Sequence, residues 1–499
     1  MNLARWNRRR TRTVVGVLLA VVVLLVAAVF VWPQVMGAST NSNGSSVSGA
    51  SSGATAAVDG GAGDGATGTD GGATPNPDPP VVPATLAIIP MKPSAKAPTA
   101  AGVAAQLATP LANKAVADLT GLVLDPVTGK VLWNKDSGTP RVPASSMKLL
   151  TGAALLASVD PNQRLVTTVV MGDKPGEIVF VGGGDVTLSA RPAGAPTMLP
   201  GGPLVSDLAA QVKAAGIKVT SIVLDTSYWS GPEMADGWSA EDIQGTPQSA
   251  KGFITKMQAL MVDDDRTDPA NEDSPRTGEP AMTAGKALAH DLGNDDLPLS
   301  EGKAPAGAKV IAKVESQPLS TLLAQSLENS DNILSEALAR QMAIARGAAP
   351  SFAGVSAAMT QALGDLGLDT SKLVVKDGSG MSGGDKVPPE LLGRVMAMAV
   401  AGKPAKLSIL LTGLPLAGVS GTLAENQRFT QPATIAGRGW VRAKTGSLDA
   451  TYALVGYVPD VDGRILVFAF NSNGVTGNVN RYAQDALSTA LRMCGCSGS

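Results

Sequence analysis

A buried helix with a serine and a lysine in its first turn is predicted near the start of the folded part of this chain. The segment Ser145-Ser146-Met147-Lys148 leads into a strongly apolar run that continues to Leu156. Residues three apart lie on one face of a helix, so the hydroxyl of Ser145 and the amine of Lys148 come within hydrogen-bonding reach. The positive end of the helix dipole also lies at this serine. Such a pair can act as a nucleophile and its base.

Histidine is the usual alternative base for a serine nucleophile, and the sequence contains one histidine, His290. It lies in a predicted surface helix, Ala284 to Leu292, far along the chain from the serine segment. A Ser-His-Asp triad would require this residue. We interpret His290 as an ordinary helix residue, so serine chemistry in this chain has to use lysine as its base.

Composition allows a large protein core and excludes some classes of partner. A length of 499 residues and a hydrophobic fraction of 44% predict two to three domains. Forty basic against 42 acidic residues give no charge-based reason to expect nucleic-acid binding. Two cysteines, Cys494 and Cys496, are too few for a zinc site and could pair with each other or between chains. No metal or other cofactor is predicted.

The N-terminus predicts a membrane anchor. Residues 1–12 contain five arginines and no acid, and Val14 to Trp32 is an unbroken apolar run. About 20 such residues span a bilayer as a helix, and the positive-inside rule places the N-terminus in the cytosol and the remaining chain outside. We expect a transmembrane helix over residues 13–32 in the cytoplasmic membrane. A cleaved signal peptide, with an apolar region of about 7 to 15 residues, is the alternative and would give a secreted protein.

Residues 33–97 are predicted to be a disordered linker. Between Gly37 and Pro83 the chain is mostly Gly, Ser, Ala, Thr, Asp and Pro, with almost no large apolar residues. Such a segment cannot bury enough surface to offset the entropy lost on ordering. Its expected mean reach is about 35 to 40 Å, which would hold a folded domain away from a membrane.

The two ends of the remaining chain contain strand patterns, and helical patterns lie between them. We predict that these strands form one antiparallel sheet flanked by helices and closed by the two chain ends. The predicted strands are Leu119–Asp125, Lys130–Lys135, Trp440–Lys444, Ala453–Val458 and Ile465–Asn471, and a final helix covers Val479–Met493. Gly446 to Ala450 is predicted to be a turn between two of the strands.

Two tripeptides follow the serine segment in order, Ser330-Asp331-Asn332 and Lys444-Thr445-Gly446. The ordered set SxxK, SxN and KTG resembles that of the penicillin-interacting serine acyl-transferases. The segments Val181–Leu188, Val314–Leu319 and Asp377–Ser382 also resemble the class C low-molecular-weight penicillin-binding proteins, the D-alanyl-D-alanine carboxypeptidase/endopeptidase family. The resemblance extends from about Leu107 to the C-terminus.

The resemblance implies an α+β fold of the penicillin-binding/β-lactamase-like transpeptidase type, with an inserted domain. It also implies a serine-type D-alanyl-D-alanine carboxypeptidase, in many relatives also a D,D-endopeptidase, that trims peptidoglycan stem peptides through a penicillin-sensitive acyl-enzyme. β-Lactam antibiotics would then be covalent inhibitors. Residues 98–164 and 299–499 would form the peptidase domain and residues 165–298 the inserted α/β domain.

Catalytic roles follow from the same resemblance. Ser145 would attack the carbonyl of the penultimate D-alanine, and Lys148 would accept its proton. Lys148 has to be neutral for this step, and burial together with the nearby Lys444 would lower its pKa. Ser330 would relay the proton to the departing D-alanine, and Asn332 would hold the amide backbone of the substrate.

The third motif and the strand that follows it are predicted to bind the substrate. Lys444 and Thr445 would bind the terminal carboxylate, and Gly446, Ser447 and Leu448 would line the cleft. By analogy with the family, the backbone N–H groups of Ser145 and Ser447 would form the oxyanion hole.

In the inserted domain, Trp238, Glu241 and Asp242 are predicted to bind the side chain of the stem peptide. In relatives an acidic residue near this point contacts a free amine, and a tyrosine follows. This chain has Gln244-Gly245-Thr246-Pro247 where that tyrosine is expected. The alternative is that Trp238 belongs to the core and the acids are solvated. The charged segment from Asp263 to Arg276 is predicted to be a flexible loop.

Two other functions are compatible with the motifs. A serine β-lactamase would need a group that activates water, and no Glu-x-x-x-Asn follows the second motif. An inactive peptidoglycan-binding protein would not need the catalytic positions, and all of them are present.

Overall fold

The structure is a computed structural model that describes residues 95–246, 249–424, 428–474 and 479–496. They belong to one compact unit, Val82–Ser499. The predicted transmembrane helix and nearly all of the predicted linker lie outside the described residues. Within the described ranges no single helix is long and apolar enough to cross a membrane. The pair Pro389–Ala401 and Ala405–Gly413 meets these criteria only jointly, across a bend of 107°.

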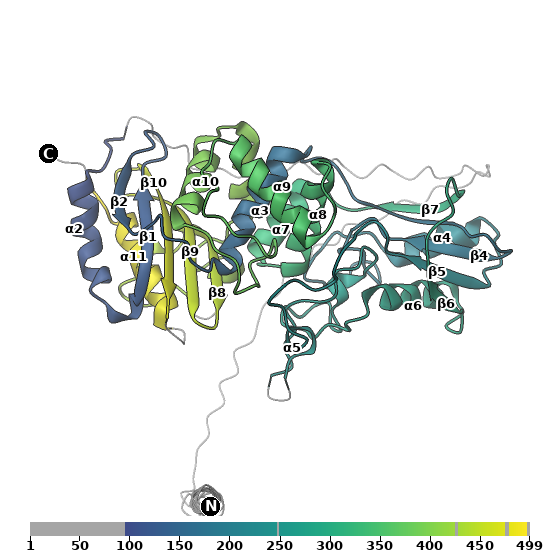
Figure 1. Cartoon of the computed structure of the whole chain (residues 1–499). Helices are drawn as coiled ribbons and strands as arrows, with labels where there is room; N and C mark the ends of the chain where they lie inside the picture. The colour runs from purple at the N-terminus through teal and green to yellow at the C-terminus, as the bar shows by residue number, and fades with distance from the viewer. Residues whose placement is uncertain (1–94, 247–248, 425–427, 475–478, 497–499) are drawn as a thin grey trace, which may run out of the picture. The chain divides into compact units, whose positions relative to one another are not determined.

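The two ends of the described chain form one antiparallel sheet of five strands, as predicted (Figure 1). Its strand order is β2-β1-β10-β9-β8, so the first strand lies beside the last. The strands are β1 (Asp118–Leu124), β2 (Val131–Lys135), β8 (Arg442–Leu448), β9 (Thr451–Pro459) and β10 (Ile465–Asn473). Side chains alternate between the two faces of β10. Phe468 and Phe470 therefore enter one apolar cluster, and Val467 and Ala469 enter another.

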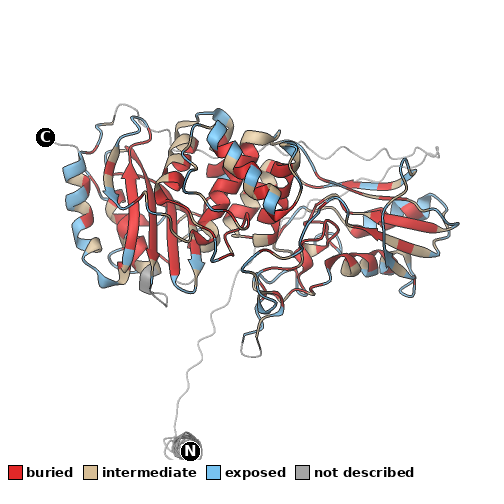
Figure 2. Ribbon diagram, in the orientation of Figure 1, coloured by how far each residue is buried: buried red, intermediate tan, exposed pale blue. Residues whose placement is uncertain are grey.

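Helices cover both faces of this sheet. One face packs against α2 (Ala100–Leu111) and α11 (Val479–Arg492), and the other packs against α10 (Pro389–Ala401). Behind α10 lies a layer of four further helices (Figure 1). They are α3 (Met147–Ser158), α7 (Leu319–Glu328), α8 (Asn332–Ala345) and α9 (Phe352–Asp365). Figure 2 shows that buried residues dominate the sheet and these inner helices, while α2 exposes one side to solvent.

A second sheet belongs to the inserted domain. Its order is β6-β5-β4-β3-β7, with parallel pairing of β4 with β5 and β5 with β6 and antiparallel pairing of β3 with its two neighbours. The helices α4 (Val205–Ala214) and α6 (Pro280–Leu292) pack on it around a separate apolar cluster. The strands are β3 (Val166–Met171), β4 (Glu177–Val181), β5 (Ser221–Asp225), β6 (Leu299–Glu301) and β7 (Val310–Glu315). The last two lie beyond residue 298, where we placed the end of the inserted domain.

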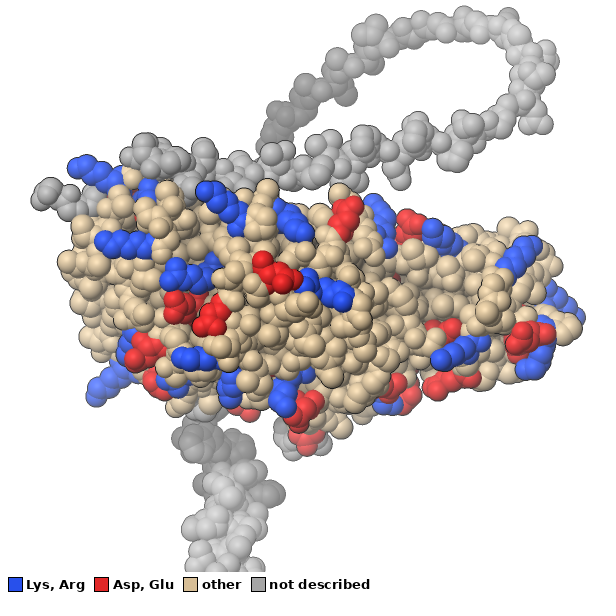
Figure 3. Space-filling view, turned by 45° about the horizontal axis from the view of Figure 1, so that its top comes forward, with Lys and Arg blue, Asp and Glu red and all other residues tan. Residues whose placement is uncertain are grey.

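Buried charges distinguish the segment from Asp263 to Arg276. Basic and acidic side chains are interspersed on the molecular face shown in Figure 3. By contrast, Asp264, Arg266 and Arg276 are buried, and both arginines form ion pairs with Asp264. The segment has one short 3-10 turn, η4 (Asp263–Asp265). The segment is a loop, as predicted, and residues 270–272 are exposed, but the paired charges hold its two ends in the core, which the sequence did not indicate.

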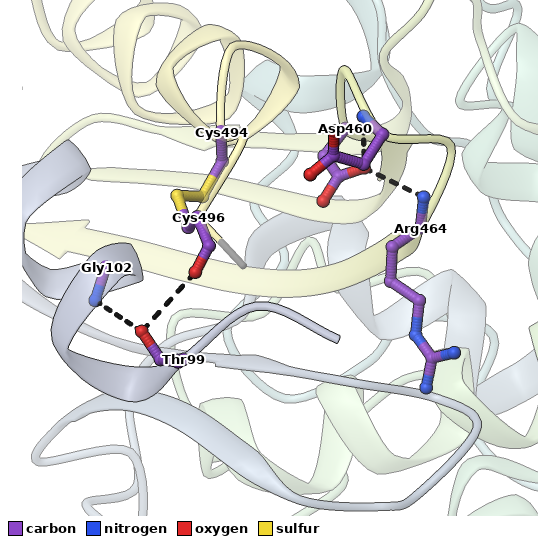
Figure 4. Close-up of a disulfide and its surroundings, with 7 residues drawn as sticks. Thr99, Gly102, Asp460, Arg464, Cys494 and Cys496 are labelled. Carbon is purple, nitrogen blue, oxygen red and sulfur yellow. Dashed lines mark hydrogen bonds between the residues drawn. A yellow bond between two sulfur atoms is a disulfide. The ribbon is translucent and has the colours of Figure 1, made fainter. Parts of the chain in front are cut away.

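The two ends of the described chain are tied together. Cys494 and Cys496 form a disulfide with each other, and the carbonyl of Cys496 accepts a hydrogen bond from the backbone N–H of Thr99 at 3.0 Å. The Thr99 hydroxyl caps α2 by accepting from the N–H of Gly102 at 3.0 Å (Figure 4). The disulfide therefore closes the C-terminal turn against the helix that opens the fold.

Candidate active site

A strained turn presents Ser145 to a cleft. The 3-10 turn η3 (Ala144–Ser146) runs directly into α3. Ala144 has φ of +47°, a left-handed conformation that costs a non-glycine residue about 1 to 3 kcal/mol. Ala144 is fully buried, and the Ser146 hydroxyl donates to the carbonyl of Pro143 at 2.7 Å. Packing around the turn therefore maintains a conformation in which the hydroxyl of Ser145 lines the cleft.

Three oxygen atoms surround the amine of Lys148. Its Nζ lies 2.9 Å from Ser145 Oγ, 2.7 Å from Asn332 Oδ1 and 2.7 Å from the carbonyl oxygen of Ser379. The last two oxygens can only accept hydrogen bonds. A neutral amine has two N–H groups and one lone pair, so its N–H groups donate to these two oxygens. Its lone pair then faces the hydroxyl of Ser145, which is the arrangement that a general base requires.

Burial favours the neutral form of this amine. Lys148 is almost completely buried, and burial lowers its pKa to about 8, against the opposing attraction of Asp377, Asp331 and Glu336. We expected burial and a second cation, Lys444, to lower this pKa; burial lowers it, and Lys444 is not among the causes. A substantial fraction of Lys148 is therefore neutral near neutral pH.

The Ser379 carbonyl is directed at Lys148 by a turn built on two buried carboxylates. Glu336 Oε1 accepts from the N–H groups of Gly378 and Ser379 at 2.7 and 2.8 Å. Asp377 Oδ1 accepts from the N–H groups of Ser379 and Gly380 at 3.1 and 2.6 Å. With its N–H groups held in this way, the turn points the Ser379 carbonyl the other way, toward the amine. The sequence marked Asp377–Ser382 only by its resemblance to the family, and nothing in it indicated that the backbone here contacts Lys148.

The second motif lies at the start of α8. Ser330 has φ of +57°, and Asp331 is the N-cap whose Oδ1 accepts from the N–H of Leu334 at 2.8 Å. Asn332 is the first helical residue. It accepts from Lys148 through Oδ1 and donates through Nδ2 to the carbonyl of Phe253 at 2.9 Å. The motif therefore joins the base of the peptidase domain to the inserted domain.

The third motif lies on β8, the edge strand of the first sheet. Lys444 Nζ donates to Ser330 Oγ at 2.8 Å and to the carbonyl of Thr445 at 3.0 Å. A side chain at Gly446 would place its Cβ 2.8 Å from the carbonyl oxygen of Pro143, so glycine permits β8 to approach the strained turn before Ser145. The strand continues to Leu448. The predicted turn from Gly446 to Ala450 begins too early, because β8 stays paired with β9 as far as Leu448 and only residues 449–450 form the turn.

All three motifs meet at one cleft of about 680 Å³. Ser145, Ser330 and Asn332 line it, as do four consecutive residues of β8, from Thr445 to Leu448. Lys148 and Lys444 lie beneath these residues, fully buried. Further lining residues escaped our sequence reasoning because none belongs to a motif: Lys251, Phe253, Arg266, Arg276, Arg428, Tyr452 and Arg481.

The three predicted binding residues of the inserted domain are placed differently. Asp242 lines the cleft, and its Oδ2 accepts from the N–H of Ser239 at 2.9 Å. Glu241 is exposed at the start of a one-turn helix and is not among the lining residues. Trp238 is half-buried and donates from Nε1 to Asp377 Oδ2 at 2.7 Å. Of the three, Asp242 alone lines the cleft, and Trp238 supports the turn that contacts Lys148.

Comparisons with known proteins agree with this geometry. The family model for D-Ala-D-Ala carboxypeptidase 3 (S13) matches residues 103–292 and 274–493. Carboxypeptidase DacB of Mycolicibacterium smegmatis is 42% identical over 432 residues, covering 86% of this chain and 92% of the relative. Carboxypeptidase Rv3627c of Mycobacterium tuberculosis is 41% identical over 426 residues, covering 85% and 90%. The crystal structure of penicillin binding protein 4 (dacB) from Haemophilus influenzae matches with a TM-score of 0.63 at 19% identity, covering 78% of this chain and 98% of that chain.

The family match includes the peptidase domain and the inserted domain, with all three motifs inside the matched residues. The structural match confirms the penicillin-binding type of fold, in which an antiparallel sheet is flanked by helices. Ser145 and Lys148, the predicted nucleophile and base, lie within hydrogen-bonding distance of each other inside the matched residues. The chain therefore belongs to the D-Ala-D-Ala carboxypeptidase 3 (S13) family and is a serine-type D-Ala-D-Ala carboxypeptidase.

Proposed function

We propose that the chain removes the terminal D-alanine from peptidoglycan stem peptides through an acyl-enzyme formed on Ser145. The observation that carries this assignment is the environment of Lys148. Two oxygens that can only accept, Asn332 Oδ1 and the carbonyl of Ser379, leave its lone pair directed at Ser145 Oγ. This directionality is what a base needs at the moment of attack.

In the acylation step, Ser145 Oγ bonds to the carbonyl carbon of the penultimate D-alanine while its proton passes to Lys148 Nζ. The tetrahedral intermediate then collapses, the C–N bond breaks, and the proton held by Lys148 passes through the Ser330 hydroxyl to the departing amine of D-alanine, which leaves Lys148 neutral again. Lys444 supports this transfer because its ammonium contacts Ser330 Oγ at 2.8 Å. In deacylation a water molecule attacks the ester, which releases the shortened peptide and regenerates the Ser145 hydroxyl.

The third motif supplies recognition of the terminal carboxylate. Lys444 contributes a positive charge beneath the cleft, and Thr445 and Ser447 line its wall. The backbone N–H groups of Ser145 and Ser447 stabilise the oxyanion, and a single such donor is typically worth about 3 to 4 kcal/mol. Because β8 is an edge strand, its free edge offers main-chain groups to an extended peptide.

β-Lactams fit the same scheme as covalent inhibitors. A crystal structure of the Haemophilus influenzae penicillin binding protein 4 was determined in complex with a β-lactam. In the present chain the strained lactam carbonyl would occupy the position of the scissile amide beside Ser145. The volume of the cleft, about 680 Å³, supports a substrate larger than a dipeptide, and we propose a D,D-endopeptidase activity besides the carboxypeptidase.

We place the enzyme outside the cytoplasmic membrane, anchored by residues 13–32. The arginines of residues 1–12 and the apolar run that follows support this placement, as does a substrate located in the cell wall. Fractionation of cells that express the full chain, with protease added from outside, tests it. Recovery of a freely secreted protein that starts near Ala38 would replace the anchor with a signal peptide.

Time-resolved mass spectrometry of the purified full chain tests the activity. Incubation with penicillin should give a long-lived adduct on Ser145, and a peptide ending in D-Ala-D-Ala should lose one D-alanine. An adduct on another residue, or no release of D-alanine, would overturn the proposal. Rapid release of hydrolysed penicillin would favour a β-lactamase instead.

A further inference from the structure

A buried arginine of the inserted domain holds the second motif. Arg266 lies with its NH2 group 2.7 Å from Asp331 Oδ2 and its NH1 group 2.9 Å from Asp264 Oδ2. The side chains of all three residues are at most 4% exposed. Burial alone would raise the pKa of Asp331, but the charge and hydrogen bond of Arg266 bring it below its ordinary value. Asp331 is therefore ionised, and the guanidinium of Arg266 is its partner.

A main-chain carbonyl of the same domain fixes the neighbouring residue. The Phe253 carbonyl accepts from Asn332 Nδ2 at 2.9 Å. Because a carbonyl can only accept, the amide of Asn332 has to direct its nitrogen toward Phe253. Its oxygen Oδ1 then faces Lys148, 2.7 Å from Nζ. The reversed amide would place an N–H donor against the lysine and would disrupt the arrangement that directs the lone pair to Ser145.

We propose that the inserted domain orients the general base, with Arg266 and the Phe253 carbonyl as positioning groups that hold Asp331 and Asn332 so that Asn332 presents its oxygen to Lys148. This inference rests on the proposed role of Lys148 as the base. It gives the inserted domain a part in catalysis besides contact with substrate. Neither positioning group touches the reacting atoms of Ser145 or Lys148.

The charges around Lys148 provide a readout that distinguishes this role from a contribution to stability. Asp331 and Glu336 on α8 and Asp377 in the adjoining turn favour the ammonium form of Lys148. On its other side, Asp331 is paired with Arg266, and Arg276 shares Asp264 with Arg266. Loss of the Arg266 charge should strengthen the effect of Asp331 on Lys148, and loss of the Asp331 charge should remove it.

The test uses the variants Arg266→Gln and Asp331→Asn and the double variant in the full chain. Asparagine is as good an N-cap as aspartate, so Asp331→Asn keeps the cap of α8. The matched control is Arg464→Gln, which breaks another buried arginine–aspartate pair, with Asp125, whose members do not line the cleft. For each variant, thermal unfolding and the rate of Ser145 acylation by a fluorescent penicillin are measured between pH 6 and 10.

We expect Arg266→Gln to lower the plateau rate by about 100-fold, the typical cost of a displacement of about 1 Å in a catalytic group. Its pH profile should move to higher pH, the profile of Asp331→Asn should move to lower pH, and that of the double variant should return toward wild type. Arg464→Gln should lose stability and keep the wild-type profile.

Two outcomes would overturn the inference while leaving the proposed function intact. In the first, wild-type Ser145 is acylated, and both single variants keep the wild-type pH profile. These variants then differ from Arg464→Gln only in stability. In the second, the pH profile of acylation by the double variant is displaced from wild type as far as the profile of Arg266→Gln. If Arg266→Gln does not fold, Arg266→Lys replaces it, because lysine keeps the positive charge and loses the planar fork of the guanidinium. A plateau rate lowered relative to Arg464→Gln would then support the inference, and a wild-type plateau rate would overturn it. If wild-type Ser145 is not acylated, the proposed function itself fails.

Discussion

Two serine–lysine pairs meet at the cleft, each with a half-buried serine that lines it and a buried lysine, and they differ in how the chain brings them together. Ser145 and Lys148 belong to one turn of chain, 2.9 Å apart, whereas Ser330 and Lys444 are 114 residues apart in sequence and 2.8 Å apart in space. At Lys148, a side-chain amide and a main-chain carbonyl accept the two N–H groups of the neutral amine. Lys444 donates to the hydroxyl of Ser330 and to the carbonyl of its own neighbour Thr445, and we propose that these different surroundings suit Lys148 to act as a base and Lys444 as a cation.

The largest expected effect separates the two serines. Ser145→Ala should reduce peptide hydrolysis by at least about 10,000-fold, because loss of the nucleophile leaves only binding and oxyanion stabilisation. Ser330→Ala should cost about 100- to 1,000-fold, the range of a lost proton relay, and should still form the penicillin adduct. Release of D-alanine and intact-protein mass spectrometry measure both. Equal losses with an adduct on Ser330 would reverse the assignment of the pairs.

The two lysines should differ when each is replaced by arginine. Lys148→Arg should lower the acylation rate by about 1,000-fold, because a guanidinium does not lose its proton and cannot act as a base. Lys444→Arg keeps the positive charge and should retain acylation by penicillin, with its main loss in KM for the peptide carboxylate. Steady-state kinetics with peptide, together with penicillin acylation rates, test this. An active Lys148→Arg enzyme would exclude general-base catalysis by this residue.

The pH dependence of acylation should report Lys148. Burial lowers its pKa to about 8, and only the neutral amine accepts a proton, so the rate should rise with pH and reach a plateau above about pH 8. Two units below the pKa about 1% of the amine is neutral, and the rate at pH 6 should be about 100-fold below the plateau. Stopped-flow acylation between pH 6 and 10 measures the profile. A profile that is flat or falls over this range contradicts the assignment.

The smallest predicted effect on the acylation rate comes from weakening the turn that contains Ser379, whose carbonyl contacts Lys148. Trp238→Phe removes the hydrogen bond from Nε1 to Asp377 while keeping an aromatic ring beside Phe352. Loss of about 1 kcal/mol of support should slow acylation by about tenfold or less.

Trp229→Phe is the matched control for this variant. Among the described residues the buried Nε1 of Trp229 has no hydrogen-bond partner, so acylation should be unchanged. Rates measured side by side decide between them. A Trp238→Phe enzyme as fast as the control would show that the Ser379 carbonyl does not depend on this bond.

The sequence predicted the parts of the site that depend on local spacing. Ser145 and Lys148 meet because they are three residues apart at the start of α3, and the short apolar runs at Ala453–Val458 and Ile465–Asn471 predicted strands of the antiparallel sheet. Two further contacts of the site involve main-chain carbonyls. The Ser379 carbonyl accepts from the amine of Lys148, and the Phe253 carbonyl accepts from the side-chain amide of Asn332. Every residue has such a group, so no sequence pattern marks the ones that bind the catalytic side chains.

Tertiary pairing explains the remaining differences. Asp264 and Arg266 belong to a run of charges of the kind that is usually solvated, and only the folded chain supplies the partners that allow their burial. Glycine at 446 is typical of turns, yet here it lies within β8 because a neighbouring turn approaches the strand closely. The roles of Asp242 and Glu241 in substrate binding stay predictions.

The position of β1 between β2 and β10 has a consequence for the order in which the enzyme folds as it is made. A chain is synthesised from its N-terminus, and domains fold as their residues emerge. Every strand of the second sheet, from β3 to β7, lies between residues 166 and 315, so this sheet has all of its members while synthesis is still under way. Strand β1 can pair with β10 only after residues 465–473 have been synthesised. The inserted domain can therefore mature first, and peptidase activity begins only when the C-terminal strands close the first sheet.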